Sequence, residues 1–237
     1  MGRAILARVQ IAAIAMEEGF DDLDALRAAL DGDARAVFCE SYANPGGYVT
    51  DIPAIAGIAD EAGVPLIVDN TLATPWLCRP IEAGATLVVH SLTKYLTGNG
   101  TVTGGAVIDS GRFDWSASDK FPSLSAPEPA YHGLKFHETF GAAAFTFHGI
   151  AIGLRDLGMT LNPQAAHYTL MGVETLALRM PRHLGHLPGR ELPEYLRRQL
   201  AALGLKPGDL FIEVHAAPGG REAQVLDPLI KFRDGLF

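Results

Sequence analysis

Three apolar segments of the sequence end in polar side chains that can take part in chemistry. Each segment is rich in aliphatic residues and stops at an acid, an amide, a hydroxyl or an amine. The polar residues that follow the three segments are Glu40, Ser41 and Asn44; Asp69, Asn70 and Thr71; and Ser91, Thr93 and Lys94. Apolar runs of this length predict buried strands of a parallel sheet. Because ligands collect at the carboxyl ends of strands in open α/β sheets, the three groups are predicted to converge on one edge.

Lys94 is the residue whose surroundings indicate a specific kind of chemistry. A lysine amine can form a Schiff base with an aldehyde cofactor. Pyridoxal 5'-phosphate requires such a lysine, a carboxylate that keeps its pyridine nitrogen protonated, and donors for its phosphate. Asp69 supplies a carboxylate, and Ser91 and Thr93 place hydroxyls next to the lysine in the sequence. The sequence therefore predicts a pyridoxal phosphate site, although each residue alone also fits an ordinary surface or turn position.

Two other chemistries are compatible with parts of the sequence. The stretch Ser91–Lys94 has the S-x-x-K spacing of serine β-lactamases and penicillin-binding proteins. Those enzymes also carry S-D-N and K-T-G elements, which do not occur here, and their motif opens a helix instead of following a strand. His132, His137 and Glu138 are close in the chain, but they do not form H-E-x-x-H and no third ligand is evident. We expect no metal site.

The elements that must position these residues alternate between strands and helices, which predicts an α/β fold with a mainly parallel sheet. Asp51 is a predicted helix cap, Pro53 lies in the first turn, and Gly63 marks the end of that helix. Asn162 is the predicted cap of a later helix that has Pro163 at its first position. The predicted strands are 34–41, 65–70, 86–91 and 104–111; the predicted helices are 19–33, 51–64, 138–160 and 162–180; and 111–135 is predicted to be a long surface loop.

The composition narrows the classes of function. The chain has 237 residues, 48% of them hydrophobic, and a net charge of −8, so nucleic acid is not an expected partner. Cys39 and Cys78 form no C-x-x-C pair and predict free thiols in a reducing compartment, with Cys39 buried in its apolar run.

Arg8 and Gln10 interrupt the apolar stretch at 1–19, which argues against a signal peptide. No apolar run reaches the ~20 residues of a membrane span. We expect a cytoplasmic protein.

The same motifs carry a family resemblance. "PLIVDNTLATP" and "VVHSLTKYLTGNG" resemble the pyridoxal-phosphate enzymes of cysteine and methionine metabolism. "ESYANPGG", "YHGLKFHETFG", "GLRDLG" and "MGVETLALRM" are similar to the O-acetylhomoserine sulfhydrylase branch of that family. The resemblance covers residues 19–180 and implies part of the large domain of a fold type I pyridoxal-phosphate transferase.

The resemblance also implies roles for individual residues. Lys94 would hold the cofactor and move protons at the α and β carbons of the substrate. Asp69 would pair with the pyridinium nitrogen, Ser91 and Thr93 would bind phosphate, and Asn44 would lie near the ring or the substrate carboxylate. The implied reaction is a γ-replacement in which O-acetylhomoserine loses acetate and gains sulfide or a thiol, giving homocysteine or methionine. Enzymes of this family are homo-oligomers; the sequence does not specify this chain's state.

The ends of the chain depart from the family pattern. Upstream of Glu40 we find no glycine-containing phosphate loop and no ring-stacking tyrosine. We therefore divide the chain into a partial cofactor domain, 1–180, and a divergent C-terminal α/β segment with a Pro-rich linker, 181–237. An arginine for the substrate carboxylate is not assigned. The expectation is weak cofactor binding with impaired turnover. The alternatives are a catalytically inactive remnant of the family and a cystathionine γ-synthase or lyase activity.

Overall fold

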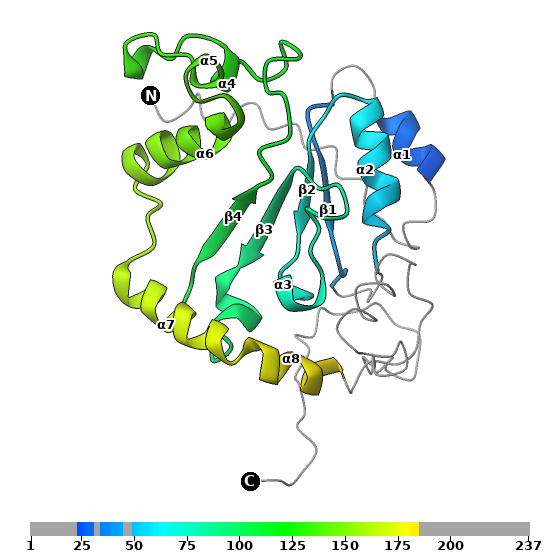
Figure 1. The fold of residues 1–237 in the computed structure, drawn as a ribbon, viewed down its shortest axis with the longest axis vertical. Coiled ribbons are helices and arrows are strands. Elements are labelled where there is room, and N and C mark those ends of the chain that lie inside the picture. Colours follow the sequence, from blue (N-terminus) through cyan, green and yellow to red (C-terminus); the bar gives the residue numbers. More distant parts are fainter. Residues whose placement is uncertain (1–22, 31–33, 45–48, 185–237) are drawn as a thin grey trace, which may run out of the picture.

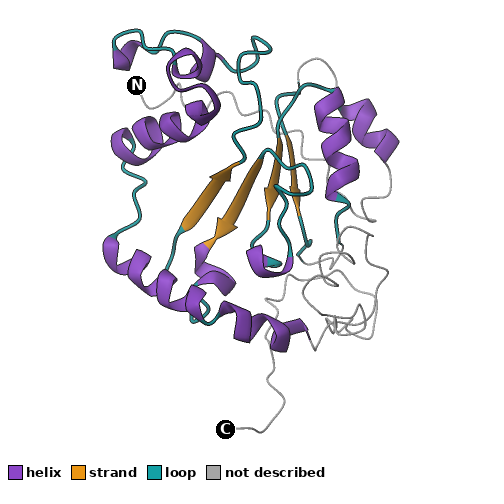
Figure 2. Cartoon of the chain, viewed as in Figure 1, coloured by secondary structure: helices purple, strands orange, loops and turns teal. Residues whose placement is uncertain are grey.

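The computed structural model describes residues 23–30, 34–44 and 49–184 (Figures 1 and 2). Several predictions from the sequence lie outside these residues. They are the assessment of the N-terminal stretch 1–19 and most of the predicted linker and C-terminal segment 181–237. The first residues of that linker, 181–184, belong to a helix, so the linker prediction was wrong there. The division of the chain at residue 180 therefore stays a prediction.

A four-stranded sheet forms the centre of the fold. Its strands are β1 (Val37–Glu40), β2 (Leu66–Asp69), β3 (Leu87–Ser91) and β4 (Gly105–Asp109), in the order β1-β2-β3-β4. All four lie within the segments predicted from the sequence. The first three are parallel and β4 is antiparallel to β3.

Helices α1 (Leu23–Ala29) and α2 (Ile52–Glu61) lie side by side next to β1 and β2 (Figure 1). The predicted start of α2 is confirmed, because the Asp51 carboxylate accepts a hydrogen bond from the Ala54 N–H over 3.2 Å. Gly63, just beyond the helix, has a φ of +63°, which glycine adopts without steric cost. Ile52 and Ile55 of α2 are fully buried in the core formed with the sheet. Cys39 is buried in the same core, as predicted.

The segment after β4 is packed more closely than the predicted surface loop. Its short helices are α4 (Pro122–Ser125), η2 (Pro129–Tyr131), α5 (Phe136–Phe140), η3 (Gly141–Ala143), α6 (Ala144–His148) and η4 (Gly149–Asp156). Trp115 is 4% exposed and its ring contacts Phe113, Phe121 and Phe145. The prediction of an exposed loop over 111–135 was therefore wrong at Trp115, because burial of large aromatic side chains dominates there.

Three helical segments lie at the edge of the sheet where β3 ends. They are α3 (Thr74–Leu77), α7 (Pro163–Glu174) and α8 (Leu176–Leu184) (Figure 1). The predicted Asn162 cap of α7 is confirmed by a 2.8 Å hydrogen bond from the Ala165 N–H. The single helix predicted over 162–180 is interrupted at Thr175 and extends to Leu184. Within the described ranges, no helix has the length and apolar character needed to cross a membrane.

Candidate active site

Asp69 and Ser91 lie on one face of the sheet at its carboxyl edge. Asp69 is the last residue of β2, Ser91 is the last residue of β3, and Asp69 is paired with Val89. Side chains alternate between faces along a strand, so the side chains of Asp69, Val89 and Ser91 share a face. His90 lies on the opposite face. The predicted convergence of the strand ends therefore brings a carboxylate and a hydroxyl to the same side.

Thr71 connects these two strand ends directly. Its backbone N–H donates to Asp69 Oδ1 over 2.9 Å, and its Oγ1 accepts a hydrogen bond from the Ser91 N–H over 2.8 Å. Among the described residues, Asp69 Oδ2 has no hydrogen-bond partner. The carboxylate is thus held by one oxygen and can accept from a ligand with the other. The sequence places Thr71 at the strand end but indicates no role for it. The Asp-x-Thr spacing, typical of an Asx-turn, was the available signal.

Asn70 supports this edge from the other face of the sheet. It is fully buried, its Oδ1 accepts from Ser41 Oγ over 2.8 Å, and its Nδ2 donates to the Cys78 carbonyl over 2.8 Å. The Asn70 carbonyl accepts from the N–H of Thr74, a buried residue with a φ of +60°. A positive φ is unusual for a β-branched residue, so this turn depends on the surrounding contacts. Ser41 and Asn70 are therefore structural residues.

Thr93 and Lys94 follow β3 in the short π-helical segment η1 (Leu92–Leu96). Thr93 Oγ1 accepts a hydrogen bond from the Gly104 N–H over 3.1 Å, which leaves the hydroxyl proton for another acceptor. Lys94 interrupts the helical geometry, with a φ of −90° and a ψ of −126°. Its side chain is exposed and makes no hydrogen bond or ion pair with the described residues. Within the described part of the chain, the Lys94 amine is therefore unpaired.

His90 does not compete with a ligand for Asp69. Burial lowers the pKa of His90, and the opposing attraction of Asp69 and the hydrogen bond to the Asn70 backbone only partly compensate. The imidazole is therefore mostly uncharged near neutral pH. Its Nδ1 has no partner in the described part of the chain. The charge of Asp69 is consequently not neutralised by the adjacent histidine.

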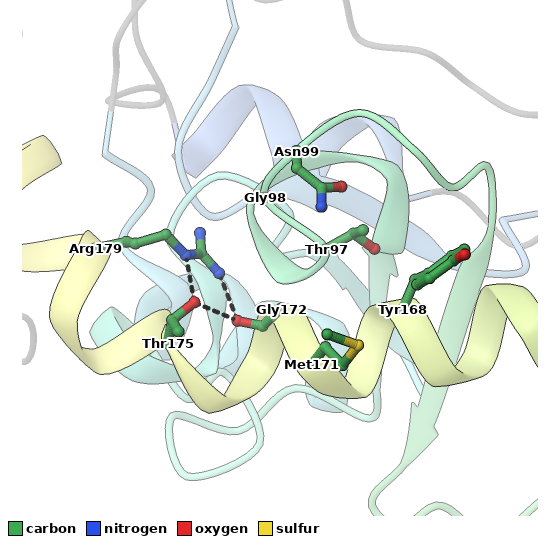
Figure 3. A pocket seen from close by; sticks show the side chains of 8 residues that line it. All are labelled: Thr97, Gly98, Asn99, Tyr168, Met171, Gly172, Thr175 and Arg179. Atoms are coloured by element: carbon green, nitrogen blue, oxygen red, sulfur yellow. Dashed lines mark hydrogen bonds between the residues drawn. The ribbon is translucent and has the colours of Figure 1, made fainter.

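Asn44 is the predicted site residue that the structure does not connect to the others. It is exposed, and its backbone N–H donates to Glu40 Oε2 over 2.9 Å. Residues 45–48, which follow it, lie outside the described residues. A pocket of about 230 Å³ near this edge also contains none of the five predicted residues (Figure 3). It is lined by Thr97, Gly98, Asn99, Tyr168, Met171, Gly172, Thr175 and Arg179.

The two alternative chemistries gain no support from the described residues. Ser91 of the S-x-x-K stretch pairs with Gly105 as the end of a strand. His137 Nε2 lies 3.6 Å from Asp114 Oδ1, whereas Glu138 forms an ion pair with Lys135, so the two neighbours face different partners. No group of three or more metal-ligating side chains occurs in the part of the chain that the structure describes.

The donor set fits pyridoxal phosphate. One carboxylate oxygen is open at Asp69, hydroxyl protons are available at Ser91 and Thr93, and the Lys94 amine is free of described partners. The carboxylate suits the ring nitrogen of the cofactor, the two hydroxyls suit its phosphate, and the amine suits its aldehyde. A phosphate needs donors, a pyridinium needs a carboxylate, and an aldehyde needs an unpaired amine.

Comparison with known proteins identifies relatives of the whole central region. The profile of the Cys/Met metabolism PLP-dependent enzymes matches residues 3–201. A sulfhydrylase of Gibberella moniliformis is 51% identical over 158 residues, which are 66% of this chain and 36% of that protein. An O-acetyl-L-homoserine sulfhydrylase of Leptospira meyeri is 43% identical over 185 residues, 75% of this chain and 41% of that protein. This chain thus spans about two fifths of the length of the curated relatives it matches.

Solved structures show the same relationship. The crystal structure of an O-acetylhomoserine (thiol)-lyase from Campylobacter jejuni matches with a TM-score of 0.65 and 40% identity, covering 69% of this chain and 41% of that one. That crystal contains N'-pyridoxyl-lysine-5'-monophosphate. A cystathionine gamma-lyase from Lactobacillus plantarum matches with a TM-score of 0.50 and 30% identity, covering 69% of this chain and 34% of that one. The described fold is therefore that of a fold type I large domain, in part.

Proposed function

Because this chain belongs to the Cys/Met metabolism PLP-dependent enzyme family, we propose that it acts in γ-replacement on O-acetylhomoserine. In this reaction the bond between the γ carbon and the acetate oxygen breaks, a carbon–sulfur bond forms with sulfide or a thiol, and acetate leaves. The product is homocysteine or methionine. Relatives named O-acetyl-L-homoserine sulfhydrylase and the more similar thiol-lyase structure support this reaction over a cystathionine-type activity.

One structural observation supports the proposal most strongly. Thr71 holds the Asp69 carboxylate and the end of β3 together, so an acid and two hydroxyls occupy one edge directly before Lys94. Pyridoxal phosphate supplies, when bound, an electron sink that stabilises negative charge on substrate carbons. Asp69 Oδ2 would accept a hydrogen bond from the protonated ring nitrogen. Ser91 and Thr93 would donate to the phosphate, and Lys94 would hold the cofactor covalently.

The exposed Lys94 amine would also move protons. A lysine that is not covalently linked to the cofactor is a base at its Nζ and can transfer a proton between the α and β carbons of a bound substrate. The uncharged His90 leaves the Asp69 charge available for the ring. The described residues thus account for holding and orienting the cofactor and for proton transfer. Asn44 remains a proposed contact of the ring or the substrate carboxylate.

We further propose a cytoplasmic setting and small-molecule partners. Cys39 and Cys78 are both buried and form no disulfide with each other, which suits a reducing compartment. The net charge of −8 argues against nucleic acid as a partner. The small-molecule partners would be an amino-acid ester and sulfide or a thiol. We also propose self-association, because the enzymes that this chain resembles are homo-oligomers.

The test is covalent trapping of the cofactor by the purified full chain. Pyridoxal phosphate is added, the visible absorption of the lysine-bound cofactor is recorded, and borohydride reduction is followed by peptide mapping. We expect a band and a label on Lys94, and both should be lost in Lys94→Ala but kept in Lys120→Ala. Asp69→Asn keeps the Thr71 contact but removes the charge, so it should weaken cofactor binding.

Protein loaded with pyridoxal phosphate but not reduced is then assayed with O-acetylhomoserine, because borohydride reduction makes the link to Lys94 permanent and prevents turnover. Formation of homocysteine with sulfide supports the proposal, whereas cystathionine formation with cysteine in place of sulfide would favour the alternative activity. Labelling of Lys94 without turnover would identify a catalytically inactive relative. Label distributed over surface lysines, with no preference for Lys94, would contradict the assigned site.

A further inference from the structure

Arg179 of α8 holds the backbone immediately after Lys94. Its Nη1 donates to the Tyr95 carbonyl over 2.8 Å. Its Nη2 donates to the Gly172 carbonyl over 2.7 Å, and its Nε donates to Thr175 Oγ1 over 3.0 Å (Figure 3). The guanidinium is partly buried and reaches two backbone carbonyls and a hydroxyl at once. It therefore connects α7, α8 and the residue that follows the proposed cofactor lysine.

Helix α7 packs against the same backbone. We define the Lys94 turn as residues 92–98. A Cβ atom placed on Gly172 would lie 2.5 Å from the Leu96 carbonyl oxygen and closer still to that of Thr97, so only glycine permits this approach. The buried hydroxyls of Thr97 and Thr169 are 3.1 Å apart and hydrogen bonded. The end of the Lys94 turn is thus held by α7 as well as by Arg179.

The kink at Lys94 explains why the Tyr95 carbonyl takes a hydrogen-bond donor from outside the Lys94 turn. The Gly98 N–H donates to the Lys94 carbonyl over 2.8 Å, and the Thr97 N–H donates to the Leu92 carbonyl over 3.1 Å. The next carbonyl, that of Tyr95, accepts from Arg179. An interrupted helix leaves carbonyls that need partners from elsewhere in the protein. Arg179 supplies one at the position directly after the lysine.

We propose that Arg179 is a positioning residue for Lys94, a role that rests on the proposed function of that lysine. Lys94 is exposed and its long side chain is flexible, so the reach of Nζ depends on where its Cα is held. Catalytic groups need to be held within about 0.5 Å of their productive geometry. By fixing the Tyr95 carbonyl, Arg179 fixes the peptide between Tyr95 and Leu96, one residue beyond Lys94, and so restrains the backbone that carries the lysine side chain.

The first experiment measures selective labelling of Lys94. Pyridoxal phosphate and borohydride are applied to the wild-type chain, Arg179→Ala and the matched control Arg182→Ala, which removes an exposed arginine from the same helix. The Lys94 label is expressed relative to that of Lys120. We expect a fall of about tenfold in Arg179→Ala, the order of magnitude of a lost charged hydrogen bond. Arg182→Ala should match the wild type.

Rescue separates positioning from general stability. Millimolar guanidinium, compared with tetramethylammonium at equal ionic strength, should restore part of the Lys94 label in Arg179→Ala, because the ion can occupy the vacated position beside the Tyr95 carbonyl. Arg179→Lys keeps the charge and should retain an intermediate label. Equal Lys94 labelling in wild type, Arg179→Ala and Arg179→Lys would overturn the proposal.

The second experiment needs no cofactor. Hydrogen exchange of the Thr97 and Gly98 amides reports the Lys94 turn, and exchange at Val68 in β2 reports the core. We expect at least about tenfold faster exchange of the turn amides in Arg179→Ala, with Val68 unchanged, since local opening is separable from global unfolding. Unchanged turn exchange would overturn the role of Arg179. Should Arg179→Ala not fold, Thr169→Val and Arg179→Lys give the same two readouts.

The two experiments distinguish the possible failures. If wild-type Lys94 is not labelled, the proposed function fails, whereas faster turn exchange in Arg179→Ala would still show that Arg179 holds the turn. If wild-type Lys94 is labelled and the Arg179 variants behave identically, the positioning role fails and the proposed function stands.

Discussion

The Ser91 N–H donates to Thr71 Oγ1 over 2.8 Å, joining the ends of two neighbouring strands. The Thr71 N–H donates in turn to the Asp69 carboxylate. One threonine thus sets the spacing between the acid proposed to contact the ring and the hydroxyl proposed to contact the phosphate. Asp69 and Ser91 are connected through Thr71, so replacing Thr71 tests this connection without changing either proposed ligand group.

Thr71→Val should weaken cofactor binding and lower stability modestly. Valine preserves the shape and the backbone N–H that Asp69 accepts from, but it leaves the partly buried Ser91 N–H without an acceptor. We expect a loss of about 1–2 kcal/mol in the free energy of unfolding and a lower fraction of labelled Lys94. Urea denaturation and cofactor titration measure the two effects. Thr139→Val, an exposed threonine in α5, is the control, and equal behaviour of both variants would count against the connection.

Gly172→Ala should destabilise the protein although alanine favours helices. The added methyl group would meet the carbonyl oxygens of Leu96 and Thr97, which belong to the backbone and cannot easily move. Overpacking of this kind costs about 1–3 kcal/mol, more than the gain of about 1 kcal/mol in helix propensity.

Gly57→Ala is the matched comparison for Gly172. Gly57 lies within α2, and a Cβ placed on it would meet no atom within 4 Å. We expect Gly57→Ala to raise the free energy of unfolding by about 0.5–1 kcal/mol. Changes of opposite sign in the free energy of unfolding of the two variants, measured by denaturant unfolding, would support the close approach of α7 to the Lys94 turn. A stabilising Gly172→Ala would show that the contact is looser than described.

His90 should make the protein less stable as the pH falls. Burial lowers the pKa of His90 in the folded state, so the unfolded chain binds a proton at a higher pH than the folded chain does. The free energy of unfolding therefore falls as pH drops through about 6.5, by at most about 1.4 kcal/mol per pH unit for one proton. The loss ends below the folded-state pKa. His148, whose pKa burial also lowers, should add to the effect.

The measurement is the pH dependence of denaturant unfolding in His90→Gln and the wild type. The slope between about pH 7 and pH 5 should be smaller in the variant, because one proton-binding group of the unfolded state is gone. Identical slopes in the wild type and His90→Gln would refute the buried, uncharged state of His90.

Cys39 should be unreactive in the folded protein. Burial, with smaller contributions from Cys78 and Glu40, raises the pKa of the Cys39 thiol to about 12, so the reactive thiolate is scarce at neutral pH. Iodoacetamide should modify Cys39 only on unfolding, as followed by peptide mapping. An introduced cysteine at exposed Ser123 is the positive control. Modification of Cys39 at the rate of that control would show that the β1 core opens locally.

Local sequence signals located the elements that position the site. Alternation of apolar runs with polar ends placed β1, β2 and β3, and Asp51 and Asn162 correctly predicted the starts of α2 and α7. These signals work because a strand core and a helix cap depend on residues within a few positions of one another. The burial of Trp115 was missed, because its stacked partner Phe145 lies outside the predicted loop that contains Trp115.

The sequence by itself determined the chemical groups available to the site: a carboxylate at Asp69, hydroxyls at Ser91 and Thr93, and an amine at Lys94. Only the tertiary structure decided how they are held. The Thr71–Ser91 hydrogen bond spans 20 residues and the bond from Arg179 to Tyr95 spans 84, so no local pattern encodes either. The reason is physical: residue type fixes what an atom can donate or accept, whereas packing between distant segments fixes which atoms meet.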